Sequence, residues 1–303
     1  MREDHVWQQI EQVLARASQR AILAAPFIKK EVFEAALAAI PSHVQDIQCV
    51  TRWSVAEVAA GVSDPEIADL AAADGRVCIT LCHNLHAKLY AADGVCLIGS
   101  ANLTGKATGR APDSNIELLI ETSTAHPEVQ RLLRVIEDTG VPGTVDLAHQ
   151  IREQADLFQA DEEAPRVLVA GHAERLIPWL PETRNPTRLY GVYNGRHGKI
   201  GRDVLAGILR DLAALDVAPG LSERAFGNAV LSRLRGIPEV KRLVEAGRLN
   251  MDDVQRELMG SVGCTAEQAR RSTETIAEWL RYFDEIHLVP IGPWEIRQGR
   301  QVM

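Results

Sequence analysis

The sequence predicts an α/β fold in its first half and a mainly α-helical domain in its second half. Short apolar runs alternate with helical patterns as far as Glu121, the strand pattern then stops, and helical patterns dominate from Gly201 onward. We therefore expect a mixed β-sheet flanked by helices, followed by a helical C-terminal domain. A chain of 303 residues is long enough for two domains that each bury a core.

Six apolar runs in the first half have the length and residue types of β-strands. They are residues 20–28, 47–52, 76–82, 87–91, 95–99 and 115–120. Apolar residues at helical spacing predict helices over 1–14, 29–40, 55–60, 65–73, 127–137 and 145–159. This alternation is typical of a sheet that is covered by helices.

The second half is expected to be built from helices. They are predicted over residues 201–215, 223–234, 238–247, 251–262 and 265–283. Thr265 is placed to cap the last helix, with Gln268 at its third helical position, and a short extended tail follows over 286–297. The order of helix, tight turn, helix and extended tail resembles a winged helix-turn-helix. Such helical hairpins also form dimer interfaces, so binding of DNA and binding of a protein partner both stay open.

The predicted division is a catalytic domain over 1–160, a linker over 161–188 and the helical domain over 189–303. If the last helix reads DNA, its exposed candidates are Gln268, Arg270, Arg271 and Thr275.

Composition favours a protein of the cytoplasm. The net charge is −8, and the acidic excess lies before residue 186, so the second half is the better side for a polyanion. The five cysteines lack metal-ligand spacing, and no apolar stretch has the roughly 18 to 20 residues of a membrane helix. We expect no metal, no other cofactor and no membrane contact.

One segment, Leu85–Gly105, carries the residues that suit phosphate chemistry. His86 and Lys88 lie two apart at the start of a predicted strand, so alternation directs both side chains to one face. A turn at Asp93 returns the chain, which brings Ser100 and Asn102 back toward them. Imidazole can act as a nucleophile or as an acid near pH 7, and the lysine and amide can hold phosphate oxygens.

The spacing of these residues resembles the signature of the phospholipase D superfamily. The string is His-x-Lys, an aspartate five residues after the lysine, and Gly-Ser-x-Asn beginning six residues after that aspartate. LHAKLY, GSANLTG and the later Asn115-x-Glu117 resemble the nuclease branch of that superfamily, and the likeness covers roughly residues 18–123.

The resemblance implies a role for each residue of the motif. His86 would attack phosphorus to form a phosphohistidine, Lys88 and Asn102 would hold the phosphate oxygens, and Ser100 would support that pocket. Glu117, on the predicted strand 115–120, would accept a hydrogen bond from the other imidazole nitrogen. Asp93 belongs to the same motif, where it is expected to pin the hairpin turn.

The superfamily's active site uses two such motifs, whereas this chain shows one clear copy. His197 and Lys199 form another His-x-Lys, but Asp203 is only four residues beyond the lysine and no Gly-Ser-x-Asn follows. We therefore expect a homodimer in which two copies of His86 meet across a twofold axis.

The motif indicates a reaction class before it indicates a substrate. We expect a metal-independent nuclease acting on nucleic acid, above all DNA, in a restriction or phage-defence system. Lys106 and Arg110, in a loop beside the motif, are candidate contacts to the substrate backbone. The alternatives are an enzyme that acts on a lipid or small diester and an inactive module that binds nucleic acid.

Overall fold

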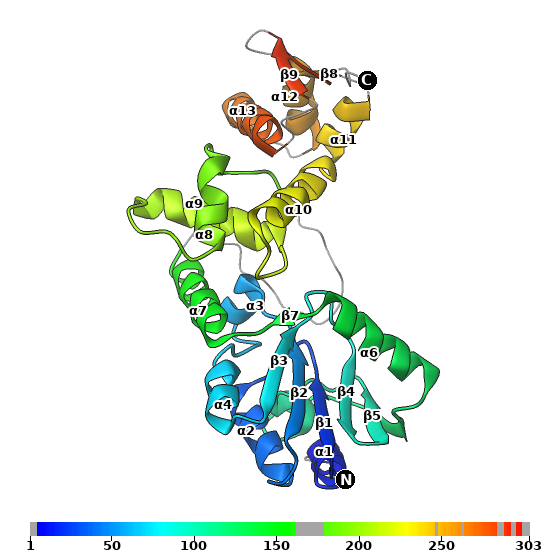
Figure 1. The fold of residues 1–303 in the computed structure, drawn as a ribbon. Coiled ribbons are helices and arrows are strands. Elements are labelled where there is room, and N and C mark those ends of the chain that lie inside the picture. Colours follow the sequence, from blue (N-terminus) through cyan, green and yellow to red (C-terminus); the bar gives the residue numbers. More distant parts are fainter. Residues whose placement is uncertain are drawn as a thin grey trace. The chain divides into compact units, whose positions relative to one another are not determined.

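A computed structural model describes residues 5–161, 179–245, 248–261, 264–283, 288–291 and 295–298, which form two compact units (Figure 1). The described residues up to 161 form the first unit, and almost all of those from 179 onward form the second. Residues 162–178 of the predicted linker lie outside the described residues. Among the described helices, none is both long enough and apolar enough to cross a bilayer.

The first unit contains a mixed sheet, as the sequence predicts, with seven strands instead of the six that were expected. Its strands, in the order β6-β5-β4-β1-β2-β3-β7, are β6 (Leu119–Ser123), β5 (Val95–Gly99), β4 (Lys88–Ala92), β1 (Arg20–Ala24), β2 (Asp46–Thr51), β3 (Val77–Leu81) and β7 (Val141–Pro142). Strands β1, β2 and β3 are parallel, and each of the other pairs is antiparallel. The long crossovers between the parallel strands carry helices, as parallel pairing requires.

Helices cover both faces of this sheet, because its strands bury side chains in alternation. Ala21 and Leu23 of β1 belong to the core beneath α1 (His5–Leu14), α2 (Lys30–Ala39) and α4 (Ile67–Asp74). Ile22 and Ala24 belong to a second core with α6 (Pro127–Thr139), which Figure 1 shows on the other side of the sheet. Successive side chains of a strand point to opposite faces of the sheet, and both faces are buried. The strands therefore appear in the sequence as nearly continuous apolar runs.

The predicted strand over 115–120 is wrong in its position. Strand β6 begins only at Leu119, because its partner β5 ends at Gly99 and offers no further ladder positions. The sequence prediction also missed β7 and the short helix α5 (Gly105–Thr108), which are too short to show a period.

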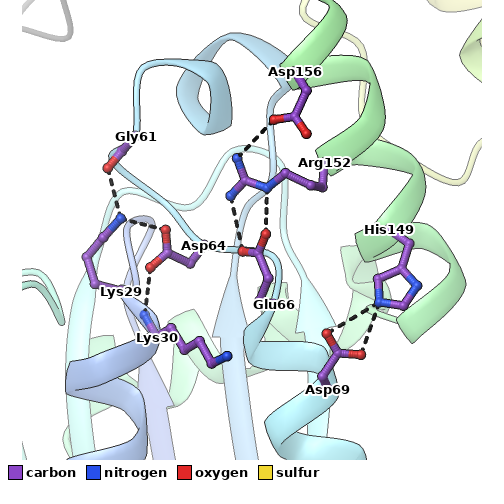
Figure 2. A network of polar contacts seen from close by, with 9 residues as sticks. All are labelled: Lys29, Lys30, Gly61, Asp64, Glu66, Asp69, His149, Arg152 and Asp156. Atoms are coloured by element: carbon purple, nitrogen blue, oxygen red, sulfur yellow. Dashed lines mark hydrogen bonds and ion pairs between the residues drawn. The ribbon is translucent and has the colours of Figure 1, made fainter.

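Helix α7 (Val145–Gln159) is fixed to the first unit by ion pairs with the first turn of α4 and the residue before it (Figure 2). Helix α3 (Val55–Ala59) precedes this region in the chain. The Arg152 guanidinium contacts Glu66 at 2.5 Å, and the imidazole of His149 lies 3.1 Å from Asp69. Although partial burial opposes it, the hydrogen bond from Arg152 leaves the pKa of Glu66 below its ordinary value. Because these contacts tie the last helix before residue 161 to the sheet layer, α7 belongs to the first unit.

The second unit is mainly helical, as predicted. Its elements are a 3-10 turn η1 (Pro186–Arg188), α8 (Leu189–Tyr193), α9 (Arg202–Leu215), α10 (Glu223–Arg235), α11 (Pro238–Glu245), β8 (Arg248–Asn250), α12 (Met251–Ser261), α13 (Ala266–Phe283), β9 (Leu288–Ile291) and β10 (Glu295–Gln298). The order from α11 to β10, with a β8-β10-β9 sheet, is that of a winged helix-turn-helix. The predicted cap also forms: Gln268 N donates to Thr265 Oγ1 at 3.3 Å, and Thr265 N donates to Gln268 Oε1 at 2.9 Å.

Candidate functional site

The β4–β5 hairpin brings the predicted phosphate-binding residues to one end of the sheet. Lys88 is the first residue of β4 and pairs in register with Gly99, the last residue of β5. His86 therefore precedes β4 at the place where Ser100 follows β5. The antiparallel pairing of β4 with β5 thus confirms the hairpin that the sequence predicts at Asp93.

Lys88 is the buried cation of this site. The residue is 9% exposed, and Nζ donates to the carbonyl oxygen of His86 at 2.8 Å. Burial, and secondarily the positive charge of Arg52, lower the pKa of Lys88, while the negative charge of Glu117 opposes this shift. The Lys88 ammonium thus holds the backbone of His86 in place, while His86 itself is exposed.

Ser100 connects the hairpin to the segment that carries Glu117. Its hydroxyl donates to the Glu117 carboxylate and accepts from Leu118 N at 3.1 Å, and its own N–H donates to Leu118 O at 3.0 Å. Asn115 Nδ2 donates to Glu117 Oε1 at 3.1 Å. Glu117 is therefore held at the site from an irregular segment rather than from a strand. Its predicted hydrogen bond to His86 stays a prediction.

Position 99 must be a glycine because the backbone at Leu118 passes very close to it. A Cβ atom on Gly99 would lie 1.9 Å from the carbonyl oxygen of Leu118, which is a backbone atom that cannot rotate away. In the same hairpin, a Cβ on Gly94 would meet nothing within 4 Å. The glycine of the Gly-Ser-x-Asn string thus allows the chain of Glu117 to reach Ser100.

We expect Gly99→Ala to destabilise the first unit by about 2 to 3 kcal/mol, because overpacking against backbone forces the two segments apart. Urea unfolding followed by circular dichroism would measure this loss. Gly94→Ala is the matched control and should change the free energy of unfolding by less than about 1 kcal/mol. Equal effects of the two substitutions would contradict this account of Gly99.

Asn102 lies in a turn that Tyr90 fixes. Tyr90 is buried on β4, and its hydroxyl donates to the Ala101 carbonyl at 2.7 Å. The amide oxygen of Asn102 is buried and has no hydrogen-bond partner among the described residues. Strand β4, which begins with Lys88, therefore also positions Ser100 and Asn102, the neighbours of Ala101.

The sequence analysis did not identify Arg52, which lies at the same end of the sheet as Lys88. It follows β2 directly, its Nη1 donates to Leu85 O at 3.2 Å, and its guanidinium is paired with Glu57. The signal was available, since a charged residue at the carboxyl end of a buried parallel strand lies at the edge where such sheets bind ligands.

Asp93 lies at the opposite end of β4 from Lys88. It has a left-handed backbone with φ 49°, and its carboxylate accepts from the backbone N–H groups of Ser18, Gln19 and Arg20 at 2.8–3.0 Å. These hydrogen bonds, the one from Arg20 first, lower the pKa of Asp93 to about 2. Asp93 therefore pins the hairpin turn to the start of β1, as expected. Although it belongs to the same motif, β4 separates it from His86, so it lies outside the group formed by the other motif residues.

A pH-dependent stability loss is expected for Asp93→Asn. Because the folded state depresses this pKa, the carboxylate stabilises the fold above the unfolded pKa of about 3.9, and the effect is lost as pH falls toward 2. At pH 7 we expect a loss of about 1 kcal/mol, since solvent screens this exposed group. Urea unfolding at neutral pH and near pH 3 should show the difference from wild type shrinking on acidification.

Asp113→Asn serves as the control for this substitution, because Asp113 is also exposed and has φ 54°. It should leave the free energy of unfolding unchanged at both pH values. A loss at Asp93 that does not depend on pH would contradict the charge-based explanation.

The two predicted substrate contacts lie beside the site on or after α5. Lys106 is exposed on this helix, so the expectation that it lies in a loop is wrong. Arg110 is also exposed, and its guanidinium lies 4.4 Å from the centre of the Trp7 ring. Among the described residues, Lys106 is thus the cation of the pair that lies over no aromatic ring.

The C-terminal candidates separate according to burial. Gln268, Arg270 and Arg271 are exposed on α13, whereas Thr275 is 3% exposed and its hydroxyl donates to Arg271 O at 3.0 Å. The expectation that Thr275 is an exposed DNA contact is therefore wrong. The helical period alone could not reveal that residues near 180–188 pack against this face.

Residues 10–138 match the family described as "Cardiolipin synthase, PLD-like domain". This match spans strands β1 to β6 and every residue of the hairpin motif. Residues 10–138 are thus similar to a phospholipase D-like domain. His86, Lys88 and Ser100 of the hairpin lie within the matched residues.

Three solved structures are similar to this chain in part. NucT from Helicobacter pylori is 11% identical, with a TM-score of 0.35 over 46% of this chain and 92% of that chain. A phosphatidylserine synthase from Haemophilus influenzae Rd KW20 is 14% identical, with a TM-score of 0.39 over 52% and 41%. Nuc, a phospholipase D family member from Salmonella typhimurium, is 18% identical, with a TM-score of 0.35 over 46% and 91%. No curated protein matches the chain.

Proposed function

We propose that this protein is a metal-independent nuclease whose active site is shared between the two subunits of a homodimer. The observation that carries the proposal is the single hairpin that places an exposed His86 beside the buried Lys88 and next to Ser100. One such set supplies a nucleophile and a cation. It does not supply the second histidine that protonates the leaving group.

In the proposed first step, an imidazole nitrogen of His86 attacks phosphorus, a nitrogen–phosphorus bond forms and a phosphorus–oxygen bond breaks. The leaving oxygen takes a proton from His86 of the partner subunit. In the second step that same imidazole removes a proton from water, the oxygen attacks phosphorus, and His86 leaves. Lys88 and Asn102 stabilise the charge on the phosphate oxygens in both steps.

The edge of the sheet beside this site has the properties of a subunit interface. Strand β6 is the edge strand, and Ile116, Leu118 and Ile120 alternate along it and the segment before it. Ile116 is fully exposed, and the other two are 63% and 56% exposed. These side chains flank Glu117, so a second copy of the chain that covers them would also bring its own His86 toward this site.

Nucleic acid is the substrate that the surroundings favour. Lys106 presents an exposed cation next to the hairpin, and a repeating phosphate backbone would reach it from the site. A lipid substrate would require a means of reaching a bilayer, and the low aromatic content of 5% offers little for an interface. Restriction or phage defence is the cellular setting that we propose.

The test is cleavage of plasmid and single-stranded DNA by the purified chain in EDTA, compared with hydrolysis of phosphatidylcholine vesicles. DNA cleavage without lipid hydrolysis is expected. Lipid hydrolysis without DNA cleavage would instead assign a lipid phosphodiesterase. DNA binding without cleavage of either substrate would assign an inactive nucleic-acid-binding module.

A further inference from the structure

We propose that a cavity within the second unit is a binding site for a small phosphate-bearing ligand of the nucleotide class. The cavity has a volume of about 880 Å³ and lies between α13, α9 and the segment that leads into η1. Side chains from all three elements line it. The arginines among them are Arg184, Arg188, Arg210 and Arg271.

The charge of this cavity favours an anion. Its four arginines face only two acidic residues, Glu182 and Asp203. Arg210 contacts Glu182 at 2.8 Å, and Arg184 contacts Glu274 at 3.4 Å. The side chains of Arg188 and Arg271 have no ion-pair partner among the described residues, so both guanidinium groups are available to a ligand.

The cavity has a fixed framework, because a buried aspartate holds the segment on one side of it. Asp211 of α9 accepts from Trp179 Nε1 at 3.1 Å, from Glu182 N at 2.9 Å and from Thr183 N at 2.7 Å. Trp279 of α13 donates from its indole nitrogen to Thr183 O at 2.6 Å. These hydrogen bonds thus connect residues 179–183 to both α9 and α13 around the cavity.

Part of the surface of α13 faces the cavity, which suits contact with a small molecule better than contact with a DNA groove. Gln268, Arg271 and Thr275 line the cavity, and across it lie Arg188 and residues of α9. A helix that reads DNA must enter a major groove about 12 Å wide with its reading face uncovered. Arg270, one residue from Arg271, does not line the cavity and is exposed on another face of α13.

The size and lining of the cavity fit a nucleotide. Small-molecule sites in proteins have volumes of roughly 300 to 1,000 Å³ and combine apolar walls with a few charged groups. Val204, which is 47% exposed, and the half-buried Leu180 offer apolar surface for a base. The arginines offer planar donors for phosphate oxygens. This inference does not depend on the nuclease proposal.

Isothermal titration calorimetry of the full-length chain with ATP and with adenosine, in EDTA, tests the proposal. The His86→Ala background prevents turnover, so a failure to bind says nothing about the nuclease. ATP is expected to bind with a Kd well below about 1 mM, and adenosine at least about tenfold more weakly. Absence of ATP binding, or equal binding of adenosine, would overturn the proposal.

Three substitutions locate the site. Arg188→Gln and Arg271→Gln should each weaken ATP binding about tenfold or more, because each removes a charge-assisted hydrogen bond. Arg270→Gln, the matched control on the same helix, should change it by less than about twofold. Equal loss in all three variants would overturn the proposal. Unchanged melting temperatures would show that the variants remain folded.

Discussion

His86→Ala is expected to reduce phosphodiester cleavage by at least about a thousandfold, because the substitution removes a nucleophile and a general acid from the same composite site. Each dimer would lose both histidines at once. Loss of either group alone typically has a large effect, and groups that act as a unit do not contribute additively. The measurement is the initial rate of DNA cleavage in EDTA.

His197→Ala is the matched control for this prediction. His197 belongs to the second His-x-Lys of the chain but lies in the second unit, between α8 and α9. Its substitution should leave the cleavage rate within about twofold of wild type. Cleavage that survives His86→Ala would place the activity elsewhere or in a contaminant, and the nuclease proposal would fail.

Mixing subunits extends the same prediction to the shared site. When wild-type and His86→Ala chains are unfolded together and refolded as random dimers, heterodimers contain only one of the two required histidines. Activity should then fall as the square of the wild-type fraction. A linear decline would mean that each subunit works alone and would contradict the composite site.

Leu118→Glu is expected to separate the dimer and to abolish cleavage with it. The substitution places a charge in the middle of the exposed apolar row that Ile116 and Ile120 complete. Burying a side chain of this kind contributes about 1.5 to 3 kcal/mol, so its loss, with a charge added, should weaken dimerisation by about a hundredfold or more. Because Leu118 is 63% exposed in the single chain, the fold itself should be little affected.

Val135→Glu provides the comparison. Val135 is another exposed apolar residue, 42% exposed on α6, and it does not belong to the edge row. Light scattering should show a dimer for wild type and Val135→Glu and a monomer for Leu118→Glu. A dimeric, active Leu118→Glu protein would refute the interface that we propose on β6.

The residues of the hairpin show how much of the site can be predicted from sequence. Alternation along β4 and a turn at Asp93 are local properties, so the approach of His86 and Lys88 to Ser100 followed from spacing alone. The cap formed by Thr265 and Gln268 was predictable for the same reason, since its two hydrogen bonds join residues three apart.

Contacts between distant segments could not be predicted in this way. Glu117 was placed on a strand because its neighbours are apolar, yet the residues around it bond to Ser100 instead of extending the ladder. Thr275 was taken as exposed because a helical period shows which positions share a face but not what covers that face. Arg52 lies beside Lys88 only because β2 and β4 flank the same strand.

The sequence by itself determined the α/β and helical halves and the hairpin that carries Lys88 and Ser100 at one end of the sheet, because these depend on periodicity, turn residues and short spacings. The tertiary structure alone decided which backbone groups the Asp93 carboxylate binds, why Gly99 must lack a side chain, and which arginines of the second unit share one cavity. These features arise where segments far apart in the chain pack together, and packing depends on the whole fold rather than on local sequence.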